Sequence, residues 1–194
     1  EGLYNAASLT SNGITQDAED CGGLPNLLLD KTFVSAAPNG DGTYTVTYTV
    51  RVINNGGAAT TYDLSDTPSF DDDVTINSGS YSGQNSGTLA AGTNTLATGE
   101  SIAAGAMHTY TLEFIVTLDL TDGVGNNMYT ACDGTTPMAG EGLFNEASLT
   151  SNGIILLDEA CGDLPALEIT KSFDAATPNG DGTFTVTYMV TVEN

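Results

Sequence analysis

Hydrophobic and polar residues alternate with a period of two in two long segments of this chain. In residues 43–53 (TYTVTYTVRVI), tyrosines and valines fall on one face and mainly threonines on the other. Residues 109–118 (TYTLEFIVTL) repeat the arrangement. Alternation of this kind, rich in β-branched and aromatic residues, is typical of half-buried strands. We therefore expect both segments to be strands with one face in a core.

Weaker patterns predict further short strands, and no segment shows a sustained helical stripe. Turn signals separate them, and Asn39-Gly40-Asp41-Gly42 predicts a tight hairpin turn. About seven or eight antiparallel strands favour an all-β fold, an immunoglobulin-like antiparallel β-sandwich. The weaker strand patterns lie at residues 27–33, 60–64, 74–77, 88–96, 127–131 and 143–150.

The chain contains an internal repeat with a period of 140 residues. Residues 1–54 and 141–194 align without a gap, with 34 of 54 positions identical. A period of this length is that of a whole domain, so the repeat predicts a tandem array of complete domains.

A Cys-Gly-x-Leu-Pro segment occurs at residues 21–25 and again at 161–165, each time before a new strand pattern. Gly and Pro at such positions are typical of a linker. We therefore expect a complete β-sandwich repeat over residues 26–165. Residues 1–25 would be the closing segment of a preceding repeat, and residues 166–194 the opening strands of the following one.

The strongly negative net charge limits the kinds of molecule that this chain can bind. The chain has 25 acidic and 3 basic residues, a net charge of -22. Lys31, Arg51 and Lys171 are the only cations that could neutralise phosphates, so nucleic acid and anionic membranes are poor partners. No apolar run has the length of a membrane span, so we expect no direct membrane insertion.

Several motifs, taken in order, resemble the conserved repeat of unknown function in very long bacterial cell-surface proteins. They are Leu27-x-x-x-Lys31-x-Phe33, the alternating TVTY strand, YDLSDTP at residues 62–68, IAAG at 102–105 and LFNEA at 143–147. The chain is also similar to acidic repeats of surface adhesins in gliding bacteria. The resemblance implies extracellular stalks, adhesins and filaments, and supplies no catalytic residues. The Gly/Ser/Asn segment 77–87 and the paired cysteines depart from the usual pattern.

The three cysteines follow the period, since Cys21 and Cys161 are equivalent positions. We predict a disulfide between Cys132 and Cys161, with the partner of Cys21 outside the fragment, because an oxidising exterior favours the bridge. Two buried free thiols or a metal site are the alternatives, although no C-x-x-C motif or histidine cluster supports a metal.

Acidic residues form candidate Ca²⁺ ligands, because this ion takes six to eight oxygen ligands. The densest set is Asp63, Asp66, Asp71, Asp72 and Asp73. Solvated surface charge is the alternative explanation. Acids near the linker could instead hold a metal between domains: Asp17, Glu19, Asp20, Asp158, Glu159 and Asp163.

Catalytic signatures do not accompany the single histidine, His108, which we expect to be a surface strand residue. We expect no enzyme activity. Lys31 and the equivalent Lys171 could be ligand-binding cations, or could pack their stems on the sheet with the ammonium beside an acid. Tyr81, in the Gly/Ser/Asn segment, is the candidate ligand-binding aromatic, with a flexible loop as the alternative.

We therefore expect a structural repeat that spans distance on the bacterial cell surface, extending a tip or forming a fibre. Its partners would be neighbouring repeats of the same chain or filament. A carbohydrate- or surface-binding module, with surface glycans as ligands, is the alternative function.

Overall fold

The computed structural model describes residues 2–119, 129–130, 132, 138–165 and 168–193. Within these ranges the regular structure consists of strands, and the predicted all-β class is confirmed. No helix among the described residues has the length and hydropathy needed to cross a lipid bilayer. The chain divides into two compact units, Glu1–Asp163 and Leu164–Asn194.

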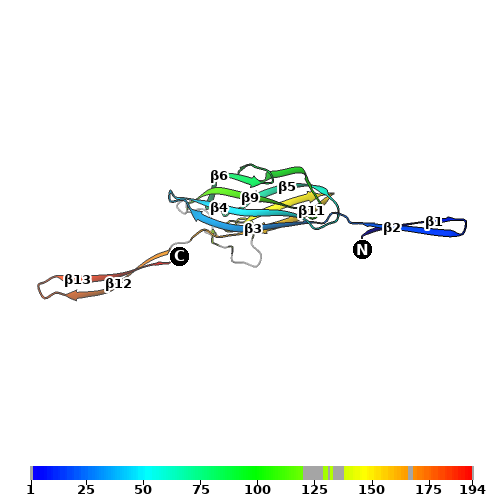
Figure 1. Ribbon diagram of the computed structural model, residues 1–194. Coiled ribbons are helices and arrows are strands. Elements are labelled where there is room, and N and C mark those ends of the chain that lie inside the picture. The colour runs from blue at the N-terminus through cyan, green and yellow to red at the C-terminus, as the bar shows by residue number, and fades with distance from the viewer. Residues whose placement is uncertain (1, 120–128, 131, 133–137, 166–167, 194) are drawn as a thin grey trace. The chain divides into compact units, whose positions relative to one another are not determined.

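The first unit contains a two-layer β-sandwich (Figure 1). One sheet has the strand order β3-β4-β9-β6-β7 and the other β11-β10-β5-β8, with every neighbouring pair antiparallel. The strands are β3 (Leu27–Pro38), β4 (Thr43–Asn54), β5 (Thr60–Pro68), β6 (Val74–Gly83), β7 (Gly87–Leu89), β8 (Asn94–Ile102), β9 (Met107–Leu118), β10 (Asn145–Ser151) and β11 (Ile154–Ala160).

The strand order is that of an immunoglobulin domain. Strands β3, β4, β9 and β6 take the places of strands A, B, E and D in one sheet, while β5, β10 and β11 take those of C, F and G in the other. Strand β8 lies beside β5, in the place of an additional C′ strand, but it follows β6 in the chain, whereas a C′ strand precedes strand D. The predicted immunoglobulin-like sandwich is therefore confirmed.

Alternating side chains from both sheets form the core. In β4 and β9 the apolar set is buried as the period-two pattern predicts, except that Tyr44 and Leu118 at the strand ends are half-buried. Tyr62, Leu64 and Leu149 face this set from the second sheet. The hydroxyl of Tyr48 in β4 donates to the carbonyl of Leu143, in the segment that leads into β10. The fully buried members of β4 and β9 are Val46, Tyr48, Val50, Val52, Tyr110, Leu112, Phe114 and Val116.

Two isolated hairpins carry the repeated sequence. Strand β1 (Leu3–Ser11) pairs with β2 (Ile14–Gly22), and in the second unit β12 (Glu168–Pro178) pairs with β13 (Phe184–Glu193). The hairpin β12–β13 keeps the pairing of β3–β4: Phe173 pairs with Tyr188 as Phe33 pairs with Tyr48, and a bulge follows in both hairpins. The hairpin β1–β2 keeps the register of β10–β11. The hairpin geometry therefore recurs with the sequence.

The turn between β3 and β4 is built as expected. Gly40 and Gly42 have φ values of 83° and 91°, which favour glycine. Asp41 Oδ1 accepts hydrogen bonds from the backbone N–H and the hydroxyl of Thr43, at 3.0 and 2.7 Å. Asp181 and Thr183 form the same contacts in the second copy.

Several strand predictions need correction. The expected strand at residues 88–96 is divided by a turn between β7 and β8, where Asn94 bonds back to Ala90. Strand β11 was not predicted, because its run Ile154–Leu157 does not alternate. The predicted strand at 127–131 lies mostly outside the described residues.

Candidate functional site

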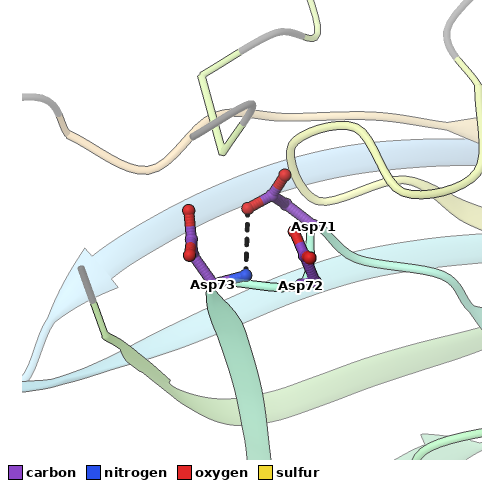
Figure 2. Close-up of side chains that lie close together, drawn as sticks. All are labelled: Asp71, Asp72 and Asp73. Atoms are coloured by element: carbon purple, nitrogen blue, oxygen red, sulfur yellow. Dashed lines mark hydrogen bonds between the residues drawn. The ribbon is translucent and has the colours of Figure 1, made fainter. Parts of the chain in front are cut away.

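An acidic loop, defined here as Asp71–Asp73, connects β5 to β6. The ligand oxygens of its three carboxylates lie within 4.8 Å of one another, and Figure 2 shows them grouped at the start of β6. Asp71 is 1 % exposed and Asp73 2 %, whereas Asp72 is open to solvent. Asp71 Oδ1 accepts the backbone N–H of Asp73 at 3.1 Å (Figure 2).

Backbone contacts hold this loop in place. The N–H of Ser69 donates to the carbonyl of Phe144, and the N–H of Asp71 donates to that of Gly142, both at 2.9 Å. Phe70 anchors the loop in the core, with its ring 5.6 Å from that of Phe114. Packing therefore forces Asp71 into the protein although a carboxylate prefers water.

The acidic loop has the donor chemistry of a calcium site. Oxygens bound to Ca²⁺ at about 2.3–2.6 Å can lie up to about 5 Å apart, which the three carboxylates satisfy. The second carboxylate oxygen of Asp71, Oδ2, is buried without a hydrogen-bond partner. A buried carboxylate oxygen without a donor is costly, and a cation would satisfy it.

The structure corrects the predicted five-residue calcium set, since it gathers Asp71, Asp72 and Asp73 and places the other two elsewhere. Asp63 Oδ1 accepts the N–H of Gly99 at 2.7 Å on strand β5. Asp66 is fully buried and paired with Lys31.

A second polar cluster, the Lys31–Asp66–Asn145 triad, lies inside the sandwich. Lys31 Nζ contacts Asp66 Oδ1, and Asn145 Nδ2 donates to Asp66 Oδ2 at 3.1 Å. Lys31 comes from β3 in one sheet, and the other two come from β5 and β10 in the facing sheet. The side chains of Lys31 and Asp66 are 0 % exposed. Of the two predicted roles for Lys31, the structure shows the side-chain nitrogen beside an acid.

Burial controls the ionisation of this triad. Desolvation lowers the pKa of Lys31, and the charge of Asp66 opposes this effect only in part. Desolvation raises the pKa of Asp66, again against the influence of Lys31. Both shifts favour the uncharged amine and the uncharged carboxyl group.

Cys132 and Cys161 form a disulfide with Cα atoms 5.6 Å apart, as the repeat predicted. Cys21 is free and exposed. The bridge lies beside the segment that contacts the acidic loop. The two sulfurs are 3.8 and 3.5 Å from the carbonyl oxygen of Glu141, and the carbonyl of the next residue, Gly142, accepts the N–H of Asp71.

The acids near the linker make local contacts instead of joining the acidic loop. Asp163 Oδ1 accepts the N–H of Cys132 at 2.9 Å, and Asp158 accepts the N–H of Lys31. Glu19 accepts the hydroxyl of Tyr4, and Asp20 the N–H of Cys21. Within the described residues, the grouping of three possible metal ligands is the acidic loop.

The Gly/Ser/Asn segment 77–87 is mostly strand, which corrects the expectation of a loop. Strand β6 continues to Gly83, and Tyr81 pairs with Gly87. A Cβ at Gly87 would lie 2.7 Å from the Tyr81 ring, so the ring covers this glycine. An open, polar depression borders Tyr81 and residues 83–86. Packing on a glycine gives Tyr81 a structural role.

His108 is half-buried and lies against the core. Its Nδ1 is 2.8 Å from the hydroxyl of Tyr62, which in turn is 2.7 Å from the hydroxyl of Tyr110. The expectation of a simple surface residue is therefore only partly met.

The member of the Lys31–Asp66–Asn145 triad that the sequence analysis missed is Asn145. Its recurrence as Asn5 in the repeat was a usable signal.

Comparison with known proteins identifies no family. No protein-family profile matches this chain, and no curated protein is similar in sequence. Among solved structures, the major pilin subunit of Bacillus cereus aligns with a TM-score of 0.39 and 10 % identity, over 97 % of this chain and 63 % of the pilin. Two structures of an exo-β-N-acetylglucosaminidase from Vibrio harveyi align with TM-scores of 0.30 and 0.27 and 15 % identity. Both alignments cover 77 % of this chain, but only 20 % and 24 % of the two enzyme chains.

Proposed function

We propose that this chain is a structural repeat of a long extracellular bacterial surface protein, which extends a tip or forms a fibre. The observation that carries the proposal is that β12–β13 repeats β3–β4 in sequence, register and bulge, while its apolar face is open to solvent. Tyr188 is 54 % exposed, whereas its counterpart Tyr48 is 0 % exposed. Such a hairpin is complete only when further strands of its own repeat cover it.

The first hairpin supports the same proposal from the other end of the repeat. Strands β1 and β2 repeat the pairing of β10 and β11, and all their residues are exposed. Leu9 is 66 % exposed, while the equivalent Leu149 is 0 % exposed. Apolar faces of this kind are typical of interfaces. Their covering partners would be the remaining strands of the neighbouring repeats.

Charge would keep such an array extended. A net charge of -22 makes neighbouring domains repel each other over about 8 Å at physiological ionic strength. The same repulsion opposes aggregation through free sheet edges. Calcium in the acidic loop would neutralise part of this charge at one end of each sandwich, and we include it in the proposal.

Extending the chain by one period tests this function. Appending a copy of residues 55–194 after Asn194 would supply the strands that β12–β13 lacks, without any new sequence. We expect the amides of Phe184–Glu193 to become protected from hydrogen exchange, and the maximum dimension in small-angle X-ray scattering to increase with each added period. Unchanged exchange, or a dimension that stays constant, would contradict the proposal.

A glycan array run on the same extended chains tests the alternative function. A structural repeat should bind no defined glycan. A carbohydrate-binding module should bind one ligand with the single repeat, and binding should not require added periods.

A further inference from the structure

The Lys31–Asp66–Asn145 triad has a chemistry that the structural role does not use. A lysine is almost never fully buried, yet the Lys31 side chain is buried here beside the carboxyl group of Asp66. The same carboxyl group also accepts a hydrogen bond from the side-chain amide of Asn145. From this geometry we propose that Lys31 and Asn145 form an intramolecular amide crosslink, with Asp66 as the group that transfers the proton.

The three side chains supply three different roles. Lys31 Nζ is the nucleophile, since an uncharged amine carries the lone pair that attacks a carbonyl carbon. The side-chain amide of Asn145 is the electrophile. Asp66 lies between them with one oxygen toward each nitrogen: Oδ1 contacts Lys31 Nζ, and Oδ2 accepts from Asn145 Nδ2 at 3.1 Å. A positioned carboxyl group of this kind acts as general acid and base.

The reaction balances without any further reactant. The lone pair of Lys31 Nζ forms a bond to Asn145 Cγ. The uncharged carboxyl group of Asp66 transfers its proton to Asn145 Nδ2, while its Oδ1 takes a proton from the attacking nitrogen. The Cγ–Nδ2 bond then breaks with its electron pair on the protonated Nδ2. One ammonia leaves, one secondary amide remains, and Asp66 ends in its starting state.

The surroundings favour this step. Lys31 Nζ lies 5.2 Å from the centre of the Tyr48 ring, which packs against Phe33 and Phe70 with ring centres 5.6 and 6.4 Å away. This apolar shell excludes water, which lowers the pKa of Lys31 and raises that of Asp66 through desolvation. The same shell protects the reacting groups from hydrolysis.

Asn145 shows a further feature that packing alone does not explain. Its side chain is 0 % exposed, and its Oδ1 is buried with no hydrogen-bond partner. Structural asparagines in protein interiors have their polar atoms satisfied, so such an atom requires an explanation. As the carbonyl of a reacting amide, Oδ1 would be the oxygen of a new amide bond.

The repeat keeps both reacting residues. Lys171 and Asn5 occupy the equivalent positions, although the flanking residues differ in both copies. Lys171 and Asn5 are both exposed. A position equivalent to Asp66 lies beyond the repeated segments, so the hairpins carry the two reacting groups without the carboxyl group between them.

The crosslink would join the first strand of the sandwich to its penultimate strand, across the two sheets. Residues 32–144 would lie inside the closed loop. If the chain acts as a stalk, which rests on the proposed function, tension entering at β3 would pass to β10 through a covalent bond. Strands β4 to β9 would then be shielded from force.

Mass spectrometry of the denatured, reduced 194-residue chain tests the proposal. We expect a mass about 17 Da below that of the sequence, one ammonia, and a branched peptide that joins Lys31 to Asn145 after proteolysis. Trypsin should fail to cleave after Lys31, whose side-chain charge is gone, and should still cleave after Arg51. The branched peptide distinguishes the crosslink from ammonia loss at an Asn-Gly pair.

Variants assign the roles. Asp66→Asn and Lys31→Met should each restore the full mass while the far-UV circular dichroism stays that of the wild type, because a variant that fails to fold would lack the crosslink for that reason alone. Asn5→Ala and Lys171→Met change the equivalent exposed residues and should leave the loss of 17 Da intact. A wild-type chain of full mass would overturn the proposal and leave a buried ion pair. A branched peptide joining Lys31 to Asp66, with a loss of about 18 Da as water, would also overturn it.

Discussion

The hairpins β3–β4 and β12–β13 have nearly the same sequence but different surroundings. Both have the same register, the same bulge and the same Asn-Gly-Asp-Gly turn. In β4 the apolar face is buried against the second sheet, whereas Val186, Val190 and Val192 of β13 remain 48–63 % exposed. Local sequence is therefore sufficient to specify the hairpin, while the core requires strands from elsewhere in the repeat.

Truncating equivalent tyrosines should give the largest difference between the two hairpins. Tyr48→Ala removes a buried ring and its hydrogen bond to Leu143, and should lower the free energy of unfolding of the sandwich by about 3–5 kcal/mol. Tyr188→Ala should change it by less than about 0.5 kcal/mol. Urea unfolding followed by circular dichroism measures both. Equal effects would mean that the second hairpin is also covered.

Removing the disulfide should affect the sandwich, whereas removing the free thiol of the first hairpin should not. Its closed loop of 29 residues corresponds to about 3.6 kcal/mol in the chain-entropy model. The double variant Cys132→Ser, Cys161→Ser should lose about this much stability, measured by thermal unfolding. Cys21→Ser removes the equivalent free thiol and serves as the control. A loss of stability in the control would show that Cys21 has a role in the sandwich.

Calcium should stabilise the sandwich and leave the hairpins unchanged. An ion at 100 times its dissociation constant adds about 2.7 kcal/mol to a state that alone binds it. Calorimetric titration of chelator-treated protein in physiological salt should show one site, and Asp71→Asn should remove it. Asp63→Asn makes the same charge change outside the acidic loop and should retain the site. A flat titration of the wild type would rule out the calcium site.

The two turns should respond equally to pH, which is the smallest expected effect. Hydrogen bonds from Thr43 hold the pKa of Asp41 below its ordinary value, and Thr183 does the same for Asp181. Because these pKa values are lowered on folding, each turn is stabilised above the unfolded pKa and loses that stability as pH falls through the folded one. Carboxyl chemical shifts in an NMR titration measure both values. Different values would show that one turn has other contacts.

Sequence patterns predicted the two strongly alternating strands over nearly their whole length, gave shorter segments for the weaker ones, and missed β11. Residues 43–53 and 109–118 were predicted because one face of each is buried and the other solvated. Strand β11 carries Ile154, Ile155 and Leu157 on an edge where all three are exposed, so no alternation marks it. In β6, a Cβ at Gly79 would meet Leu89 and Phe114 at 2.9 and 3.0 Å, so core packing selects a residue that usually indicates a loop.

The two candidate sites differ in the same respect, since one could be recognised in the sequence and the other could not. The density of carboxylates at Asp71–Asp73 was visible in the sequence because those residues are adjacent. The triad was not visible, because Lys31, Asp66 and Asn145 belong to three strands whose pairing depends on the whole sandwich.

By itself, the sequence determined the period of the repeat, the hairpins with their turns, the acidity and the all-β class. These depend on interactions between residues close in the chain, or on composition. The tertiary structure decided which copy of each hairpin is buried, and that Asp66 faces a lysine and an amide inside the core. These outcomes depend on which distant strands pack together, because burial and its effect on ionisation are properties of the assembled sandwich.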